Sequence, residues 1–368
     1  MTAYVLGVYT HPASPREDGL RLEEMVYRTS RAALDAAEVS RRQLDHLTLA
    51  ACDELDGRPI SSMLMAAPAG GYGIDEIKVT DSGASALCLE YARLTSGEFS
   101  LGLVTSWCKS SKTDLDSVFR YRADPFFLRP LGIGERAGDA LFAQAAGEVF
   151  GVSEEEAGRR VVRAYERAAR NPRGLRHPVP TVEAVNASPF ESTPVRERHR
   201  APATDGAVSL VLASEEFVHS NRECKPIAKL LGVGWATDSF RLDRERLVAQ
   251  RAARSAWQAA MQRAGLSSSA DLDVIELESP TGYHEAVYAR IFELDDDDPK
   301  VSPSGGAFAQ NPVFCTGLVN AAEAVLQVAG QAGPVQVADA RTALAHGSFG
   351  CAQQGHVVAI FASAGDRP

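Results

Sequence analysis

Two segments of the chain share one pattern of apolar and polar positions. Residues 21–38 and 244–264 are rich in alanine and place apolar side chains at helical spacing. Each is followed by a short polar turn, a Leu-Asp pair and an apolar run, at residues 44–50 and 272–277. Runs that are apolar throughout suit strands buried on both faces of a sheet. The pattern therefore predicts a duplicated α/β unit in which helices cover buried sheets.

A segment of different character separates the two repeats, at roughly residues 106–204. It contains a helical stretch over residues 153–170, which Asn171-Pro172 ends, and then a proline-rich stretch. A buried strand at residues 208–212 returns the chain to the core. We therefore expect an insertion within the first half of the chain.

Composition narrows the class of protein. The chain has 368 residues and a formal net charge of -10, which argues against broad binding to nucleic acids. No apolar stretch is long enough to span a membrane, and the start lacks the features of a signal peptide. The six cysteines form no Cys-x-x-Cys pair, so we expect no metal site and a cytoplasmic location.

One loop carries the most specific signal. Residues 302–317 contain Gly305-Gly306, a short apolar stretch, Asn311-Pro312 and then Thr316-Gly317. This frame resembles the active-site loop of the thiolase superfamily, nearest to its sterol-carrier-protein-type, lipid-transfer-like branch. That loop normally has a catalytic His where Asn311 stands. An amide cannot take a proton at neutral pH, but it can donate a hydrogen bond to a thioester oxygen.

The resemblance implies a fold for nearly the whole chain. Thiolases have an α/β fold of five layers, αβαβα, in which two duplicated halves face each other and a loop domain is inserted. We therefore expect an N-terminal half at residues 1–225, including the insertion, and a C-terminal half at residues 226–368. In the family, the inserted loop domain helps to bind coenzyme A.

Two catalytic positions of the family are replaced here. Thr80, in the segment Thr80-Asp81-Ser82-Gly83, stands where the nucleophilic Cys is expected. A Thr hydroxyl needs an adjacent base to act as a nucleophile, and the alternative is that Thr80 or Asp81 caps the following helix. Glu278 stands where a second family His is expected. It is a general base if burial raises its pKa, or else a structural carboxylate.

A third motif, near the C-terminus, is better preserved. Ala345-His346-Gly347-Ser348 and the residues after it resemble the His-Gly-x-Gly-Gly loop of the sterol-carrier-type branch. His346 is the best remaining acid–base candidate, and a structural His bonded to the backbone is the alternative. From the same resemblance we expect Gly305, Gly306 and Ser348 to contact the bound substrate carrier.

The insertion is rich in arginine although the chain is acidic. Arg159 and Arg163 lie within its helical stretch. Eight further arginines lie within or after that stretch, namely Arg160, Arg167, Arg170, Arg173, Arg176, Arg196, Arg198 and Arg200. They form a candidate site for the phosphates of coenzyme A or for the acidic face of an acyl carrier protein. The alternative is a solvated helix face on which they pair with Glu154, Glu155 and Glu156.

Two functions remain open at this point. The first is an enzyme of lipid metabolism that makes or breaks a carbon–carbon bond next to a thioester, as an aldolase or acyltransferase, without a covalent Cys intermediate. The second is a catalytically inactive thiolase-like subunit that stabilises a Cys-bearing or OB-fold partner. Aldol chemistry on a coenzyme A thioester does not need the Cys, and we favour the enzyme. An ordinary Cys-dependent thiolase is the least favoured reading.

The resemblance also implies partners. We expect a homodimer or a heterodimer with a thiolase-like chain, formed through residues 82–106 and in particular through the apolar run 101–104. A small OB-fold zinc-ribbon protein is a further possible partner. We expect no permanently bound cofactor, with coenzyme A or an acyl carrier protein delivering the substrate, and no nucleic acid or membrane partner.

Overall fold

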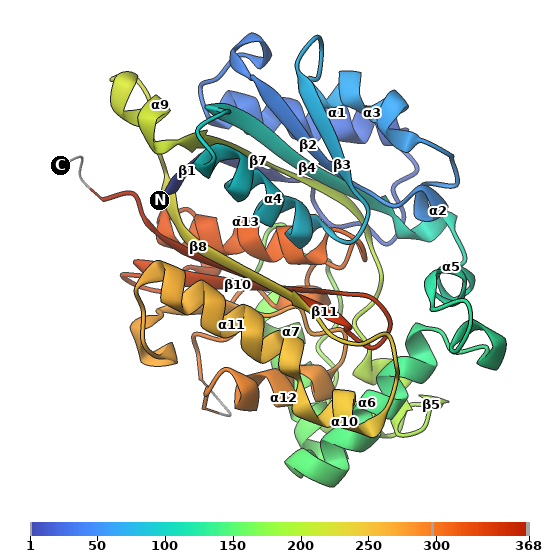
Figure 1. Cartoon of the computed structure of the whole chain (residues 1–368). Coiled ribbons are helices and arrows are strands. Elements are labelled where there is room, and N and C mark those ends of the chain that lie inside the picture. The colour runs from blue at the N-terminus through green and yellow to red at the C-terminus, as the bar shows by residue number, and fades with distance from the viewer. Residues whose placement is uncertain (1, 296–297, 366–368) are drawn as a thin grey trace.

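The structure is a computed structural model and describes residues 2–295 and 298–365. Nine strands pair in the continuous order β3-β2-β4-β7-β1-β8-β11-β10-β9. The two strands at the join, β1 (Ala3–Thr10) and β8 (Ala228–Thr237), pair only between residues 3–5 and 228–230. The sheet divides there into two layers, which lie one above the other in Figure 1.

The two layers have the same strand order. The remaining strands of the first layer are β2 (His46–Ala50), β3 (Asp75–Val79), β4 (Leu101–Lys109) and β7 (Asp205–Ser214). Those of the second are β9 (Val274–Glu276), β10 (Thr342–Phe349) and β11 (Gly355–Ser363). The order of the first layer is β3-β2-β4-β7-β1, and the order β9-β10-β11-β8 of the second layer repeats its last four strands. The place of β3 is taken in the second layer by a single bridge from Val301 to β9. The predicted duplication is therefore present in the fold.

Helices complete the five layers. Figure 1 shows α1 and α3 above the first sheet layer, α4 and α13 between the layers, and α11 and α12 below the second. Their bounds are α1 (Leu22–Ala36), α3 (Ser61–Ala69), α4 (Gly83–Thr95), α11 (Arg251–Ala264), α12 (Gly282–Ile291) and α13 (Thr316–Val328). Nearly every residue of α13 is buried, because sheets cover it on both sides. The predicted five-layered α/β fold is confirmed.

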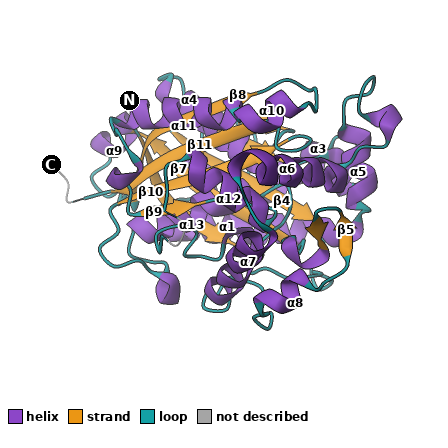
Figure 2. Cartoon of the chain, turned by 90° about the horizontal axis from the view of Figure 1, so that it is seen from below, coloured by secondary structure: helices purple, strands orange, loops and turns teal. Residues whose placement is uncertain are grey.

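The inserted region gathers at one side of the molecule, where Figure 2 shows α6 and α7 beside α12. Its helices are α5 (Leu115–Arg122), α6 (Glu135–Phe150), α7 (Glu154–Ala168) and α8 (Val182–Asn186), followed by the short strands β5 (Phe190–Ser192) and β6 (Val195–Arg196). The predicted helix at 153–170 corresponds to α7, which Ser153 caps. The insertion begins later than residue 106, because β4 continues to Lys109.

Two further expectations need correction. The helix expected at residues 244–264 is two helices, α10 (Arg244–Ala249) and α11, because Gln250 between them has a left-handed backbone with φ 47°. The apolar run 101–104 is not near a surface, since β4 is fully buried and pairs with β2 on one side and β7 on the other. The short helices α2 (Asp53–Asp56) and α9 (Glu215–Ser220) complete the described elements. Within residues 2–295 and 298–365, no helix combines the length and apolar character needed to cross a membrane.

Candidate active site

A cavity of about 740 Å³ lies where the insertion meets the two halves of the fold. Its wall includes residues of α5, of the start of α6, of the end of the insertion, of the loop before α13 and of the loop after β10. Of the residues singled out in the sequence, it brings together Glu278, Asn311 and Ser348. Thr80, His346, Gly305, Gly306, Arg159 and Arg163 do not line it.

Glu278 sits in a small pocket of backbone. A Cβ atom added to Gly317 would lie 2.8 Å from Glu278 Oε2, so only glycine leaves room for this carboxyl group. The backbone N–H of Ser348 donates to the same oxygen at 3.1 Å, and Oε1 accepts no hydrogen bond from the described residues. Burial raises the pKa of Glu278 to about 8. The group is therefore largely protonated at neutral pH, yet close enough to ionisation to exchange a proton.

Asn311 is held with its amide oxygen engaged. Thr316 Oγ1 donates to Asn311 Oδ1 at 2.8 Å, and the Asn311 N–H donates to Thr204 Oγ1 at 3.1 Å. The Thr204 N–H donates in turn to the Asn311 carbonyl. Because Oδ1 already accepts, Nδ2 is the group of this amide that remains available at the cavity, and it has no partner in the described part of the chain. A fixed N–H donor of this kind suits an oxyanion.

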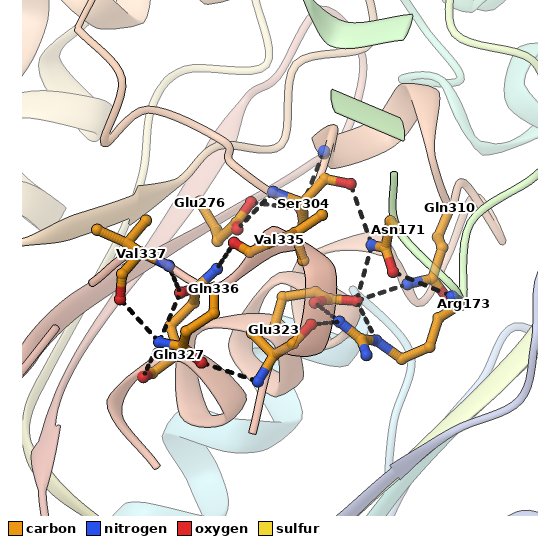
Figure 3. A network of polar contacts seen from close by, with 12 residues as sticks. Asn171, Arg173, Glu276, Ser304, Gln310, Glu323, Gln327, Val335, Gln336 and Val337 are labelled. Carbon is orange, nitrogen blue, oxygen red and sulfur yellow. Dashed lines mark hydrogen bonds and ion pairs between the residues drawn. The ribbon is translucent and has the colours of Figure 1, made fainter. Parts of the chain in front are cut away.

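A buried polar network fixes the loop that carries Asn311 (Figure 3). Glu323 on α13 accepts two hydrogen bonds from Arg173, at 2.8 and 2.6 Å, and one from Gln310 at 2.9 Å. Asn171 Nδ2 donates both to Glu323 and to the carbonyl of Ser304. Gln310 immediately precedes Asn311, so the network ties the insertion, α13 and the loop together.

A second carboxyl group closes the same network (Figure 3). Ser304 donates to Glu276 from its hydroxyl at 2.6 Å and from its backbone N–H at 3.2 Å. Glu276 is fully buried at the end of β9. Burial, and then the nearby Glu323, raise the pKa of Glu276 to about 8. Glu276 is therefore a neutral acid at neutral pH, while Glu323 is held by Arg173.

The paired glycines of the loop have a packing role. Gly305 and Gly306 have positive φ angles of 91° and 52°. A Cβ at Gly305 would lie 2.6 Å from the backbone nitrogen of Ala168 at the end of α7. A Cβ at Gly306 would lie 3.2 Å from the Leu277 carbonyl oxygen. Neither glycine lines the cavity, and their contact with a substrate carrier stays a prediction. The loop needs Gly305 to approach α7 closely.

Thr80 is exposed at the end of β3, and its carbonyl accepts a hydrogen bond from Arg122 Nη2 at 2.8 Å. No described side chain hydrogen-bonds to its hydroxyl, so the base that a Thr nucleophile needs is missing. The alternative role as a helix cap is wrong for both Thr80 and Asp81. Ser82 is the N-cap of α4, and its Oγ accepts from the Ser85 N–H at 3.1 Å.

His346 lies in the core below the cavity. Its Nε2 is 2.9 Å from His356 Nδ1, and Tyr288 and Phe292 pack against its ring. Burial, and then the neighbouring His356, hold the pKa of His346 well below its ordinary value. His346 is therefore buried away from the cavity, and its ring is bonded to another histidine side chain and not to the backbone as the structural alternative supposed. Ser348 is two residues further along β10 on the same face, and it does line the cavity.

Of the ten arginines that the sequence suggested in the insertion, Arg198 and Arg200 line the cavity, whereas Arg159 and Arg163 do not. Arg159 is paired with Glu155 at 2.8 Å on the outer surface of α7, and Arg163 is paired with Glu285 on α12. This fits the alternative of a paired helix face, with the partner of Arg163 on another helix. The cavity is instead lined by Arg122, Arg136, Arg198 and Arg200.

Sequence reasoning also missed Glu135. It is the first residue of α6 and lines the cavity. Burial, and then the nearby Asp139, raise its pKa to about 7. No motif surrounds it, and the only available signal was its place beside Gly134 at the start of a helical stretch.

The cavity contains one cysteine, Cys351. Burial raises the pKa of its thiol to about 11, so it is protonated and a poor nucleophile at neutral pH. All six cysteines are free thiols. Within residues 2–295 and 298–365, no three His, Cys, Asp or Glu side chains are grouped so as to hold a metal ion. The side chains that line the cavity can supply acid–base and hydrogen-bond chemistry.

The sequence is similar to known proteins over part of its length. The family described as thiolase C-terminal domain-like matches residues 299–363. The acetyl-CoA acetyltransferase of Methanothermobacter thermautotrophicus is 29% identical over 228 residues, which are 56% of this chain and 58% of that protein. Sterol carrier protein 2 of Oryctolagus cuniculus is 30% identical over 166 residues, which are 39% of this chain and 30% of that protein. The matches thus span about half of the first relative's length and less of the second.

Solved structures match over the full length. Human mitochondrial 3-ketoacyl-CoA thiolase has a TM-score of 0.79 at 17% identity, with 99% of each chain covered. The Ltp2-ChsH2(DUF35) aldolase has a TM-score of 0.80 at 16% identity, covering 99% of this chain and 98% of that one. At such identities the likeness shows the fold. The chain thus has the fold of these thiolase-type structures over nearly its whole length, and its residues 299–363 are similar to the thiolase C-terminal domain-like family.

Proposed function

We propose that this chain is an enzyme that makes or breaks a carbon–carbon bond next to an acyl thioester, as an aldolase or acyltransferase, without a covalent Cys intermediate. One observation carries the proposal: a carboxyl group poised near neutral pH and an open amide donor share one cavity, whose only thiol is firmly protonated. The similarity to an acetyltransferase, a thiolase and an aldolase supports an acyl-thioester substrate.

Each group has a role in this proposal. Asn311 Nδ2 donates a hydrogen bond to the thioester oxygen and stabilises the negative charge that develops there when the α-carbon becomes an enolate. Glu278 exchanges a proton with that α-carbon, through the oxygen that accepts no hydrogen bond. Ser348 keeps the carboxyl group in place through its backbone N–H.

The substrate carrier is proposed to be coenzyme A, with an acyl carrier protein as the second candidate. Arg198 lines the cavity and is exposed to solvent. Its guanidinium makes no ion pair or hydrogen bond with the described residues, so it is available to a phosphate group. Among the arginines that the sequence suggested for this role, we therefore propose Arg198 in place of Arg159 and Arg163.

An assembly is part of the proposal. The strand β3 is an edge of the sheet, and Ile77 on it is exposed, as is Tyr72 just before it with 86% of its surface accessible. We propose pairing of this edge with a second thiolase-like chain, in place of the buried run 101–104. The Ltp2-ChsH2(DUF35) aldolase contains a second protein by its name, which supports the proposal of an additional partner. We propose an OB-fold zinc-ribbon protein for this partner from the resemblance of the sequence alone. The free thiols support a cytoplasmic location.

The second candidate function is an inactive subunit. It is favoured by the absence of a base at Thr80 and by the burial of His346 in the core. Under this alternative the chain would stabilise a Cys-bearing or OB-fold partner.

Exchange of α-protons separates the two functions. The purified chain, with any partner that copurifies, is incubated with acetyl-CoA in heavy water, and deuterium in the acetyl group is followed by mass spectrometry. Asn311→Ala should slow exchange about a hundredfold, since one preorganised donor is removed. Glu278→Gln should abolish it, while the matched cavity variant Cys351→Ala should leave it unchanged and no acyl-enzyme should appear by intact mass. Exchange that survives in both site variants would favour the inactive subunit.

A further inference from the structure

We propose that Glu135 is a second acid–base residue of this cavity, and that it exchanges a proton with an oxygen on the β-carbon of the substrate while Glu278 serves the α-carbon. The inference rests on the proposed function and deepens it, because two such groups specify a β-hydroxyacyl thioester as substrate.

Geometry singles out Glu135 among the acidic residues of the cavity. These are Asp81, Asp116, Glu135, Glu197 and Glu278. Asp81 and Glu197 are exposed at the rim, and Asp116 is paired with Arg120. Glu135 is partly buried, and its carboxylate makes no hydrogen bond or ion pair with the described residues. Among the described acidic residues of the cavity, only Glu135 and Glu278 are sheltered from solvent and make no ion pair.

The groups behind Glu135 explain why it stays unpaired. Asp139, one turn further along α6, accepts hydrogen bonds from Arg200 at 2.6 Å and from Gln353 at 3.1 Å. Arg200 also binds Glu191 at 2.6 Å, so its charge is already shared by two carboxylates. Glu135 is left facing the cavity at the end of this cluster.

The surrounding charges set the protonation states. Burial, Asp139, Glu191 and Asp116 raise the pKa of Glu135 to about 7, and Arg200 opposes them. Glu135 in turn contributes to the raised pKa of Glu278, which lies at about 8. A form with one of these carboxyl groups ionised and the other protonated is therefore populated near neutral pH, and we assign the ionised role to Glu135. This form is a base and an acid within one cavity.

That form suits cleavage of a β-hydroxyacyl thioester. The Glu135 carboxylate takes the proton of the β-hydroxyl group, and the bond between the α- and β-carbons breaks. The β-carbon becomes a ketone or aldehyde, and the electron pair of the bond passes to the thioester enolate at Asn311. Glu278 then gives its proton to the α-carbon. Proton exchange with solvent restores both carboxyl groups, and the reverse sequence is an aldol addition.

The test compares two reactions in one set of variants. Cleavage of β-hydroxyisovaleryl-CoA to acetone and acetyl-CoA needs both carboxyl groups, whereas exchange of the α-protons of acetyl-CoA needs Glu278 only. Glu135→Gln should lower kcat for cleavage by about a hundredfold or more and leave exchange intact. The control Glu197→Gln, at the exposed rim of the same cavity, should change neither.

The pH dependence supplies a second readout. In the unmodified protein, cleavage should be greatest between about pH 7 and pH 8, where Glu135 is ionised and Glu278 is still protonated. In Glu135→Gln the lower limb of this profile should vanish. Undiminished cleavage in Glu135→Gln, or exchange without any cleavage in the unmodified protein, would overturn the role of Glu135 alone. Absence of exchange in the unmodified protein would overturn the proposed function and this inference with it.

Discussion

Replacing Glu276 by Gln should make the stability of this protein less sensitive to alkali. Glu276 is fully buried and accepts two hydrogen bonds from Ser304, and its pKa is raised from 4.5 to about 8. A Gln side chain has the same shape as the protonated acid. Its oxygen can accept from the Ser304 N–H, and its amide can donate to the Ser304 hydroxyl. The substitution therefore keeps the network but removes the buried titration.

The sign and size follow from proton linkage. Between about pH 4.5 and pH 8 the folded protein holds a proton on Glu276 that the unfolded chain has released. The free energy of unfolding therefore falls as the pH rises, by about 1.4 kcal/mol for each step of one in pH. Between about pH 6 and pH 9 the loss amounts to about 3 kcal/mol, and Glu276→Gln should not suffer it.

Urea unfolding at the two pH values measures this difference. Glu278 and Glu135 contribute losses of the same sign in both proteins, so the quantity to compare is the change between pH values, variant against unmodified protein. The control Glu197→Gln removes an exposed carboxylate and should behave like the unmodified protein. Equal pH dependence in Glu276→Gln and the unmodified protein would refute the buried, neutral state of Glu276.

Two further outcomes are expected. Ile77→Lys places a charge on the exposed edge strand β3 and should shift a dimer toward monomer in light scattering. The control Tyr27→Lys, on the outer helix α1, should leave the dimer unchanged. A dimer that persists in Ile77→Lys would exclude this edge as the interface. Burial lowers the pKa of His356 from 6.5 to about 3, so stability should fall as the pH drops below about 6.5. Thermal unfolding measured from neutral to acid pH checks this loss of stability. His356→Gln should make the stability less sensitive to acid, because the buried imidazole that resists protonation is removed.

The local pattern of apolar and polar residues predicted the fold, but it did not predict where a helix is broken. The strands β2 and β9, in which every residue is buried, and the amphipathic helices before them identify the repeat. The break at Gln250 has no glycine or proline to announce it, and its left-handed backbone is fixed by the packing around it. Such a break depends on tertiary contacts that a local pattern does not contain.

The candidate site was predicted only in part, because part of it also depends on tertiary contacts. The loop motif located Asn311, and the strand end located Glu278, because both follow from the order of residues. His346 has the correct spacing, yet the rings of Tyr288 and Phe292 cover it. Glu135 faces the cavity only because the start of α6 forms part of the cavity wall. Arg163 points away from the cavity because it is paired with Glu285 on another helix. Which side of an inserted helix faces a cavity is a property of the assembled chain.

The duplication brings two equivalent helices to one point. The helices α4 and α13 occupy matching places in the two halves, and the N–H of Gly83 at the start of α4 donates to the carbonyl of Phe314 just before α13. Ser82 and Phe314 both line the cavity. Each helix carries partial positive charge at its N-terminus. An anion formed in the cavity is therefore favoured by the backbone itself, so this preference for negative charge does not depend on which side chains line the cavity.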